Sequence, residues 1–364
     1  MNYRQLEMSM SVEPTTEPQS ESVARLSNKS EDTVSVVIPC YNEERYIGKA
    51  LEQLADQFAV DQYELVIVDG MSEDNTRGVI EDFKKKEPNL VVRIVDNPAR
   101  NIPTALNLGI SAAKGNIIAR MDAHAVPCSG YIRRCVEVLN QETAGAVGMP
   151  CLVRAGADTT MAQAIATAVS HPFGIGDAKY RLGAGGPLQE AVDTVAFACF
   201  RKSLWQELGG FNENLLTNED YDFNYRVRQS GRDVILDRSG HCDYFARTTL
   251  GSLATQYWRY GGWKAEMIRL HPTSVKLRHV VAPAFVLSLI ALGVASVLWS
   301  PARWLLLVDV LLYLIAALAA SWRTRIEVKR FQHLFLMPIV FATIHFTWGM
   351  SFILRSVSFR KREA

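Results

Sequence analysis

The chain has 364 residues, of which 48% are hydrophobic and 21% are charged, and its formal net charge is +1. This length suffices for one large domain or two smaller ones, and the near-neutral charge gives no reason to expect nucleic acid as a partner. The six cysteines form no Cys-x-x-Cys pair and lie mostly in apolar runs. They argue against a zinc site or a disulfide framework and predict buried free thiols in a reducing compartment.

Residues 1–32 are rich in Glu, Ser and Thr and lack the apolar segment of a signal peptide. They predict a disordered tail. A regular alternation follows, with strands expected at 34–39, 63–69, 91–95 and 116–121 and helices at 43–57, 72–86 and through 105–110. This alternation predicts a parallel sheet with helices on both faces, and we place a first domain at residues 33–265.

The pattern loosens after Gly130. Helices are expected near 131–141, from Ser203 and over 218–230, strands near 145–149 and 233–236, and ordered structure over 192–200. The Gly-rich residues 174–187 have weak periodicity and predict a mobile loop.

The last part of the chain, residues 266–364, is expected to be a juxtamembrane and membrane domain. Segments 280–299, 303–322 and 334–354 are almost free of charge, with Asp309 as the one acid and Trp299, Trp304 and Trp322 at segment ends. Each is long enough to cross a bilayer, so they predict transmembrane helices.

The orientation of these segments leaves two alternatives open. One basic cluster follows the second segment and another follows the third, and the positive-inside rule places both in the cytosol. Three full crossings would separate the clusters. Either the rule fails at the tail, or the third segment, with Pro338, His345 and Gly349, is re-entrant or interfacial.

Polar residues follow three of the predicted strands, at 39–43, 69–76 and 122–124. The carboxyl ends of parallel strands meet at one edge, so together these residues describe a nucleotide pocket. Asp122 and His124 point the same way from a strand and predict a divalent-cation site. Taken singly, each cluster is equally explained by helix capping.

Two further clusters admit two interpretations each. Glu219 and Asp220 at a helix start are capping acids, or Asp220 is a general base for a sugar hydroxyl. Residues 256–264, just before the membrane segments, are an interfacial aromatic belt, or they place Arg259 near a diphosphate and aromatic rings near a sugar.

The motifs at 37–43, 68–74, 105–110, 122–124 and 218–220 together resemble the inverting family 2 glycosyltransferases. The resemblance runs from about Val34 to Lys264. It implies an α/β GT-A fold, which is Rossmann-like with a mostly parallel central sheet and helices on both faces, followed here by C-terminal transmembrane helices. Residues 192–195, the Tyr257-to-Gly261 element and the membrane tail are similar to the succinoglycan-type bacterial exopolysaccharide glycosyltransferases.

The resemblance also implies roles for individual residues. Asp220, with Glu219 beside it, would be catalytic, and like-charge repulsion from Glu219 would suit Asp220 to base work. Asp122 and His124 would bind Mg²⁺ or Mn²⁺, although the family usually has Asp where His124 stands. Gln256 and Tyr260 would bind the acceptor, with Tyr260 in place of the family's Trp. The nucleotide-sugar would contact Pro39, Tyr41, Glu43, Asp69, Asn107 and Arg259.

The implied activity is transfer of a hexose from a nucleotide-diphosphate sugar, a UDP-sugar, to a lipid-linked (polyprenyl-diphosphate) oligosaccharide in extracellular polysaccharide biosynthesis. Its implied setting is the bacterial inner (cytoplasmic) membrane, multi-pass, with the catalytic domain in the cytosol and other polysaccharide-assembly enzymes as partners.

A dinucleotide-dependent oxidoreductase is disfavoured, because no Gly-x-Gly-x-x-Gly follows the first strand. A non-catalytic membrane-anchored binding protein would be expected to have lost Asp122 or Asp220. A processive synthase would need more membrane segments. A polyprenyl-phosphate sugar transferase is the nearest alternative, because it shares the donor site and the anchor.

Overall fold

The computed structural model describes residues 32–59, 62–183, 185–328 and 331–358. Thr33–Ala364 form one compact unit. The predicted disordered tail lies outside the described residues except for Asp32, so that expectation stays a prediction.

The central sheet has eight strands in the order β3-β2-β1-β4-β9-β6-β10-β8. The first four, β1 (Val34–Cys40), β2 (Tyr63–Asp69), β3 (Val91–Asp96) and β4 (Ile117–Arg120), pair in parallel as predicted. β6 (Ala144–Gly148) and β10 (Asp233–Asp237) are also parallel. Two antiparallel strands, β8 (Gln189–Ala191) and β9 (Cys199–Arg201), complete the sheet.

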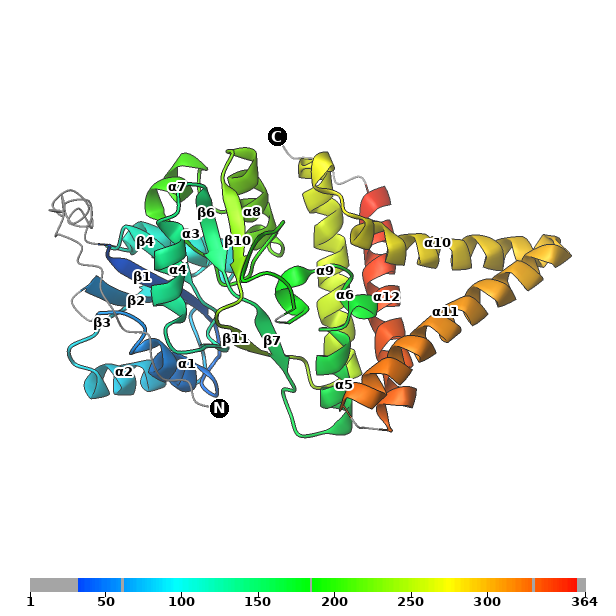
Figure 1. The fold of residues 1–364 in the computed structure, drawn as a ribbon, viewed down its shortest axis with the longest axis horizontal. Coiled ribbons are helices and arrows are strands. Elements are labelled where there is room, and N and C mark those ends of the chain that lie inside the picture. The colour runs from blue at the N-terminus through cyan, green and yellow to red at the C-terminus, as the bar shows by residue number, and fades with distance from the viewer. Residues whose placement is uncertain (1–31, 60–61, 184, 329–330, 359–364) are drawn as a thin grey trace, which may run out of the picture. The chain divides into compact units, whose positions relative to one another are not determined.

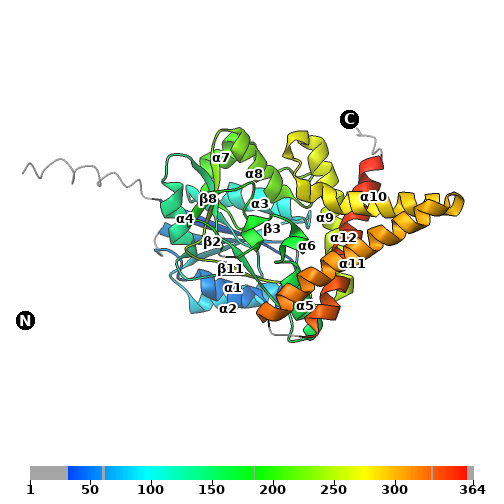
Figure 2. The same ribbon diagram turned by 45° about the vertical axis from the view of Figure 1, so that its right-hand side comes forward.

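Helices cover both faces of this sheet, as expected (Figures 1 and 2). One face packs against α1 (Ile47–Leu54), α2 (Thr76–Lys86) and α4 (Tyr131–Leu139), and the other against α3 (Ile102–Ala112), α7 (Lys202–Glu207) and α8 (Glu219–Gln229). The alternation of β1 explains the division: Val36 and Ile38 face the first layer, whereas Val37 packs on α3.

A second, three-stranded sheet was not predicted. It consists of β5 (Ala125–Pro127), β11 (Cys242–Phe245) and β7 (Cys151–Arg154) in that order. Because β5 begins immediately after His124, pairing of β5 with β11 fixes the turn between β4 and β5. α5 (Thr160–Ala168) precedes the Gly-rich residues 174–187. Within that stretch the structure has the end of α6 (Pro172–Ile175) and the 3₁₀ turn η2 (Lys179–Arg181).

The C-terminal part consists of α9 (Leu250–Leu270), η3 (Pro272–Ser274), α10 (Leu277–Leu298), α11 (Ser300–Val328) and α12 (His333–Val357). Leu277–Leu298, Ser300–Thr324 and His333–Val357 are long and apolar enough to cross a membrane, which agrees with the three predicted segments. The predicted domain boundary after residue 265 falls within α9.

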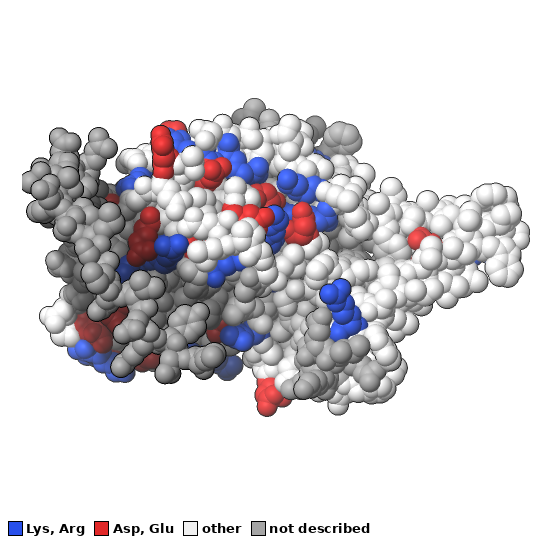
Figure 3. All heavy atoms as spheres, viewed as in Figure 1, with Lys and Arg blue, Asp and Glu red and all other residues white. Residues whose placement is uncertain are grey.

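The three apolar helices differ in their surroundings. In Figure 1, α10 and α11 form a projecting hairpin, whereas α12 runs beside α9 and across the hairpin. Figure 3 shows the hairpin surface almost free of charge. Only 11% of the α10 and α11 spans is buried inside the protein, against 33% of the α12 span. The hairpin therefore has a mostly exposed apolar surface, whereas α12 packs against the body that carries the sheet.

α9 and α12 pack closely along their lengths. Near the middle of the contact Gly261 lies against the backbone of Trp348, where a Cβ atom would collide with the carbonyl oxygen. At the far end, Arg355 pairs with Glu266 at 2.6 Å, and Arg269 donates to the carbonyl oxygens of Arg355 and Ser356. The two helices thus form one rigid pair.

All six cysteines are free, five of them buried and Cys128 half-buried. This confirms the prediction of buried free thiols.

Candidate active site

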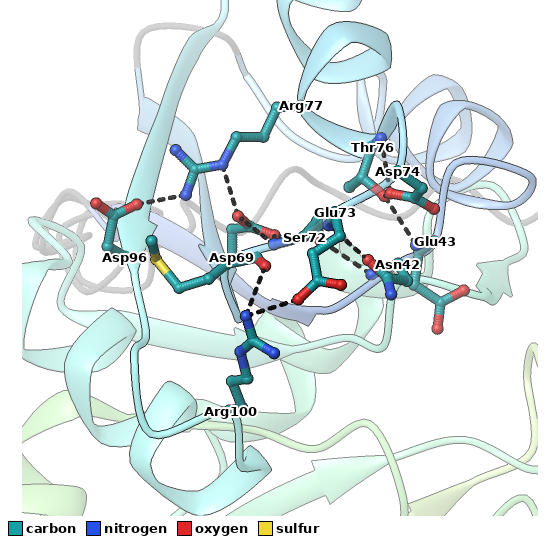
Figure 4. A network of polar contacts seen from close by, with 11 residues as sticks. Asn42, Glu43, Asp69, Ser72, Glu73, Asp74, Thr76, Arg77, Asp96 and Arg100 are labelled. Carbon is teal, nitrogen blue, oxygen red and sulfur yellow. Dashed lines mark hydrogen bonds and ion pairs between the residues drawn. The ribbon is translucent and has the colours of Figure 1, made fainter.

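The ends of β1, β2 and β3 are joined by a polar network (Figure 4). The Asp69 carboxylate is fully buried and accepts hydrogen bonds from Ser72 and, at 2.6 Å, from Arg77 Nε. Arg77 continues to Asp96 at the end of β3, at 2.5 Å. Asp69 therefore fixes the floor of this region, with both carboxylate oxygens already engaged.

Tyr41 provides an exposed aromatic face above this floor, with 42% of its surface accessible. The Arg100 guanidinium lies 5.3 Å from the ring centroid and pairs with Glu73 at 2.9 Å. Asn42, Met71 and Arg100 have positive φ angles of 53°, 60° and 51°. Non-glycine residues adopt this conformation at an energetic cost, and such residues gather at binding sites. Sequence reasoning missed Arg100.

Asp122 and His124 follow β4, as predicted. The Glu43 carboxylate lies 3.1 Å from His124 Nδ1, which leaves the other ring nitrogen, Nε2, for a ligand. Burial lowers the pKa of His124, but the hydrogen bond to Glu43 and the charge of Asp122 outweigh it, so the pKa is raised overall. Glu43, predicted to touch the nucleotide, is placed here as the partner of His124.

The chemistry of these donors fits a divalent cation shared with a substrate. Among the described residues no group of three His, Cys, Asp or Glu side chains has the arrangement of a metal site. Asp122 and His124 would supply one carboxylate and one imidazole to such a cation, and the remaining ligands would come from the substrate phosphates and water.

Arg120, which sequence reasoning missed, lies between two acids at the end of β4. Its Nη2 is 3.1 Å from Glu219 and 3.4 Å from Asp122. Burial raises the pKa of Glu219, although Arg120 counteracts the rise. Glu219, the acid expected to act on Asp220, is therefore already paired with a buried cation. A buried Arg in an otherwise apolar strand was the available sequence signal.

Asp220 is the carboxylate at the start of α8 that stays accessible. Its Oδ1 accepts a hydrogen bond from the backbone N–H of Tyr221 at 2.7 Å, and it has no ion pair within 4.0 Å among the described residues. Asp220 also lines a large cavity. Its geometry suits a group that must take up a proton from a bound molecule.

That cavity has a volume of about 850 Å³ and brings together seven of the predicted residues. These are Asp122, His124, Glu219, Asp220, Gln256, Arg259 and Tyr260. Gln256 donates hydrogen bonds to the hydroxyls of Tyr244 and Tyr260, at 3.1 Å and 3.0 Å. The cavity continues between α10, α11 and α12, where Ala282, Phe285, Leu312 and Trp348 line it.

Five predicted residues are not among those that line the cavity: Pro39, Tyr41, Glu43, Asp69 and Asn107. The first four belong to the strand-end region described above. The Asn107 amide is occupied by the turn after α7, where it bonds the backbone of Phe211 and the side chains of Trp205 and Glu213. Its assignment to the nucleotide-sugar stays a prediction, as do the other assigned roles.

Besides Arg120, several cations in the cavity wall were not assigned from the sequence, and two of them lie against tyrosine rings. The Arg181 guanidinium lies 5.5 Å from the ring centroids of Tyr180 and Tyr244 and, among the described residues, has no carboxylate within ion-pair distance. Lys264 is the second. Their roles depend on residues distant in the chain, and so no local pattern marks them.

Comparisons with known proteins show which proteins this chain resembles. Residues 35–209 match the profile of Glycosyl transferase family 2. The chain is 27% identical over 332 residues to the succinoglycan biosynthesis protein ExoA of Rhizobium meliloti (strain 1021), which covers 90% of this chain and 96% of the relative. It is 26% identical over 241 residues to the dolichyl N-acetyl-alpha-D-glucosaminyl phosphate 3-beta-D-2,3-diacetamido-2,3-dideoxy-beta-D-glucuronosyltransferase of Methanococcus voltae, covering 65% of this chain and 74% of the relative.

Among solved structures, the mannosyltransferase PcManGT from Pyrobaculum calidifontis, in complex with GDP-Man and Mn²⁺, has the same fold. The TM-score is 0.59 with 19% sequence identity, and the match covers 91% of this chain and 88% of that one. The chain is therefore a glycosyltransferase of GT-A fold. Its residues 35–209 match the Glycosyl transferase family 2 model, and the chain is similar to a succinoglycan-type relative, as the motifs predicted.

Proposed function

We propose that this protein transfers a hexose from a nucleotide-diphosphate sugar, a UDP-sugar, to a polyprenyl-diphosphate-linked oligosaccharide during extracellular polysaccharide biosynthesis. One observation carries the proposal: a single cavity holds Asp122, His124 and the accessible Asp220 and continues between the apolar helices. The names of the relatives, a succinoglycan biosynthesis protein and a glucuronosyltransferase named for a dolichyl N-acetylglucosaminyl phosphate, support a lipid-carried acceptor.

The donor site combines two neighbouring regions. Tyr41 and Arg100 would hold the base, above the floor fixed by Asp69. Asp122 and His124 would hold Mg²⁺ or Mn²⁺, and the Mn²⁺ named with PcManGT supports a divalent ion. The ion supplies positive charge to the diphosphate. Arg181 and Arg259 line the same cavity and would add positive charge as the diphosphate departs.

Asp220 would act as the base in a single in-line displacement. The acceptor oxygen forms a bond to the anomeric carbon while the bond from that carbon to the diphosphate breaks, which inverts the configuration. The hydroxyl proton goes to Asp220, and the nucleoside diphosphate leaves. Glu219, paired with Arg120, would fix the end of β4 against the start of α8 and so hold Asp122 near Asp220.

The test is Asp220→Asn, which preserves shape and removes the basic oxygen. We expect kcat to fall by about 10²–10⁴-fold, the usual contribution of a general base, with the donor Kd changed by less than about twofold. Asp82→Asn, at the exposed Asp82 of α2, is the matched control and should leave kcat unchanged. Turnover of Asp220→Asn within a few-fold of wild type would assign the base to another group.

The membrane arrangement follows from the contrast between the hairpin and α12. The 22 residues of α10 extend about 33 Å, enough for a hydrocarbon core of ~30 Å. α12 is paired with α9, which carries Arg259, Glu266 and Arg269, and each charge at the bilayer centre costs about 2.5–3.5 kcal/mol. We therefore propose that only the hairpin crosses, that α9 and α12 lie at the interface, and that the catalytic domain is cytosolic at a bacterial inner membrane.

A further inference from the structure

Lys264 of α9 is a buried cation without an acidic partner. It is 6% exposed, and its Nζ lies 3.4 Å from the ring centroid of Tyr221. Among the described residues it makes no ion pair within 4.0 Å and no hydrogen bond through its ammonium group. Removing an ammonium from water is costly unless an anion or several acceptors replace the water. A ring face replaces only part of that hydration.

The surroundings of Lys264 connect the proposed base with the membrane helices. Tyr221 follows Asp220 directly, and its hydroxyl donates to Ser274 between α9 and α10. The neighbouring cation, Arg278, is already bound by Asp177 and Asp193. Lys264 is thus the unpaired cation at this point of the cavity wall, whereas Arg278 has its charge balanced by two acids.

Lys264 and Arg120 have different charged neighbours, and Asp220 is common to both. The charges that act on Lys264 are those of Asp220, Arg278 and Asp193, whereas Arg120 is influenced by Asp122, Glu219 and Asp220. Burial lowers the pKa of Lys264 to about 7, and a bound anion would favour the charged form. Asp220 therefore interacts with two different sets of charged groups. One includes Arg120 and Asp122, and the other includes Lys264, Arg278 and Asp193.

Beyond Lys264 the cavity wall is largely apolar, although Asp309, Tyr313 and His345 also line it. Its lining continues over Val281, Ala282 and Phe285 of α10, Leu312 of α11 and Trp348 of α12. Val281 and Leu312 are 58% and 61% exposed, on helices long enough to cross a membrane. A cation followed by an apolar channel open toward lipid matches an amphiphile with an anionic head and a hydrocarbon tail.

We infer that Lys264 binds the phosphate nearest the prenyl chain of the lipid-linked acceptor, whose hydrocarbon lies between α10, α11 and α12. The inference rests on the proposed function and specifies its acceptor site. Because Lys264 lies against Tyr221, which directly follows Asp220, the accepting hydroxyl lies close to the lipid phosphate, and the acceptor is a prenyl diphosphate carrying a short oligosaccharide.

The experiment measures binding of geranylgeranyl phosphate to the purified full chain in detergent by tryptophan fluorescence, together with the donor Kd. Lys264→Met keeps the length of the side chain and removes the charge. We expect its Kd for geranylgeranyl phosphate to rise at least about tenfold, as for loss of a hydrogen-bonded charge, with donor binding unchanged. Geranylgeraniol, which lacks phosphate, should bind wild type and variant alike.

Lys49→Met is the matched control, because Lys49 also lies over an aromatic ring, that of Phe245, but outside the cavity lining. It should bind as wild type does. Val281→Trp tests the channel independently of Lys264 and should weaken binding of both the phosphate and the alcohol.

An unchanged Kd for geranylgeranyl phosphate in Lys264→Met would overturn the inference. Inorganic phosphate that bound to wild type as tightly as the prenyl phosphate would also overturn it, because the site would then recognise phosphate without the prenyl chain. Failure of the proposed function looks different: wild type would bind donor and prenyl phosphate yet transfer sugar to no prenyl-linked acceptor.

Discussion

At the scale of single residues, pairs of basic and acidic side chains hold the site in place. Arg120 joins Glu219 to Asp122, and Glu43 orients His124. The pair of Asp122 and His124 combines a hard oxygen with a nitrogen donor. Mg²⁺ prefers oxygen donors, whereas Mn²⁺ tolerates imidazole more readily, so the identity of residue 124 should influence the choice of metal.

His124→Asn tests this dependence, because an amide can donate to Glu43 while offering an oxygen to the metal. We expect EDTA to abolish activity in wild type and variant, and the ratio of Mn²⁺-supported to Mg²⁺-supported activity to fall by about tenfold in the variant. Activity is measured across titrations of each metal. His241→Asn, at a half-exposed histidine near Asp243, is the control. A ratio that stays at the wild-type value would remove His124 from the metal shell.

The site residues predicted from the sequence share a simple origin. Asp122 and His124 lie in the short turn between β4 and β5, and Asp220 lies at the start of α8, where local pattern is informative. Lys264 and Arg181 lie against the rings of Tyr221 and Tyr244, which the fold brings to them from distant segments of the chain. A single sequence contains no pattern that records such pairings.

At the scale of elements, length decides what was predictable. β1 and β2 have seven residues each, almost all buried, and their apolar runs predicted both strands and the parallel sheet. β5 and β9 have three residues each, too few to show a period. Their pairing is set by tertiary contacts, and so the antiparallel strands and the second sheet were missed.

The contact between α9 and α12 gives a prediction at this scale. Gly261→Ala would place a Cβ against the Trp348 carbonyl, and the helix backbone cannot rotate away as a side chain can. Overpacking of this kind typically costs about 1–3 kcal/mol and should lower Tm by about 1–4 °C in a chain of this length. Thermal unfolding in detergent measures the change. Gly251→Ala, in the same helix with open space around it, should be neutral or slightly stabilising. Equal effects of the two changes would contradict close packing of α9 on α12.

At the scale of the whole unit, the hairpin and the α9–α12 pair define how the cavity meets the bilayer. If α9 and α12 lie at the interface, the cavity mouth lies at the level of the lipid head groups, where a prenyl phosphate presents its sugar. Both basic clusters noted in the sequence then lie on the cytosolic side, which satisfies the positive-inside rule without an exception.

Single-cysteine labelling distinguishes this arrangement from three full crossings. The reporters are Lys86→Cys on α2, Leu298→Cys at the hairpin tip, where Leu298 is 93% exposed, and Ser358→Cys after α12. The native cysteines are buried apart from half-buried Cys128, which is first replaced by Ser to lower the background. A membrane-impermeant maleimide is applied to intact and to lysed spheroplasts. We expect Leu298→Cys to react in intact spheroplasts, and Lys86→Cys and Ser358→Cys to react only after lysis. Three crossings would instead expose Ser358→Cys to the reagent in intact spheroplasts, on the same side as the hairpin tip, and the α9–α12 pair would then have to carry its charges through the bilayer.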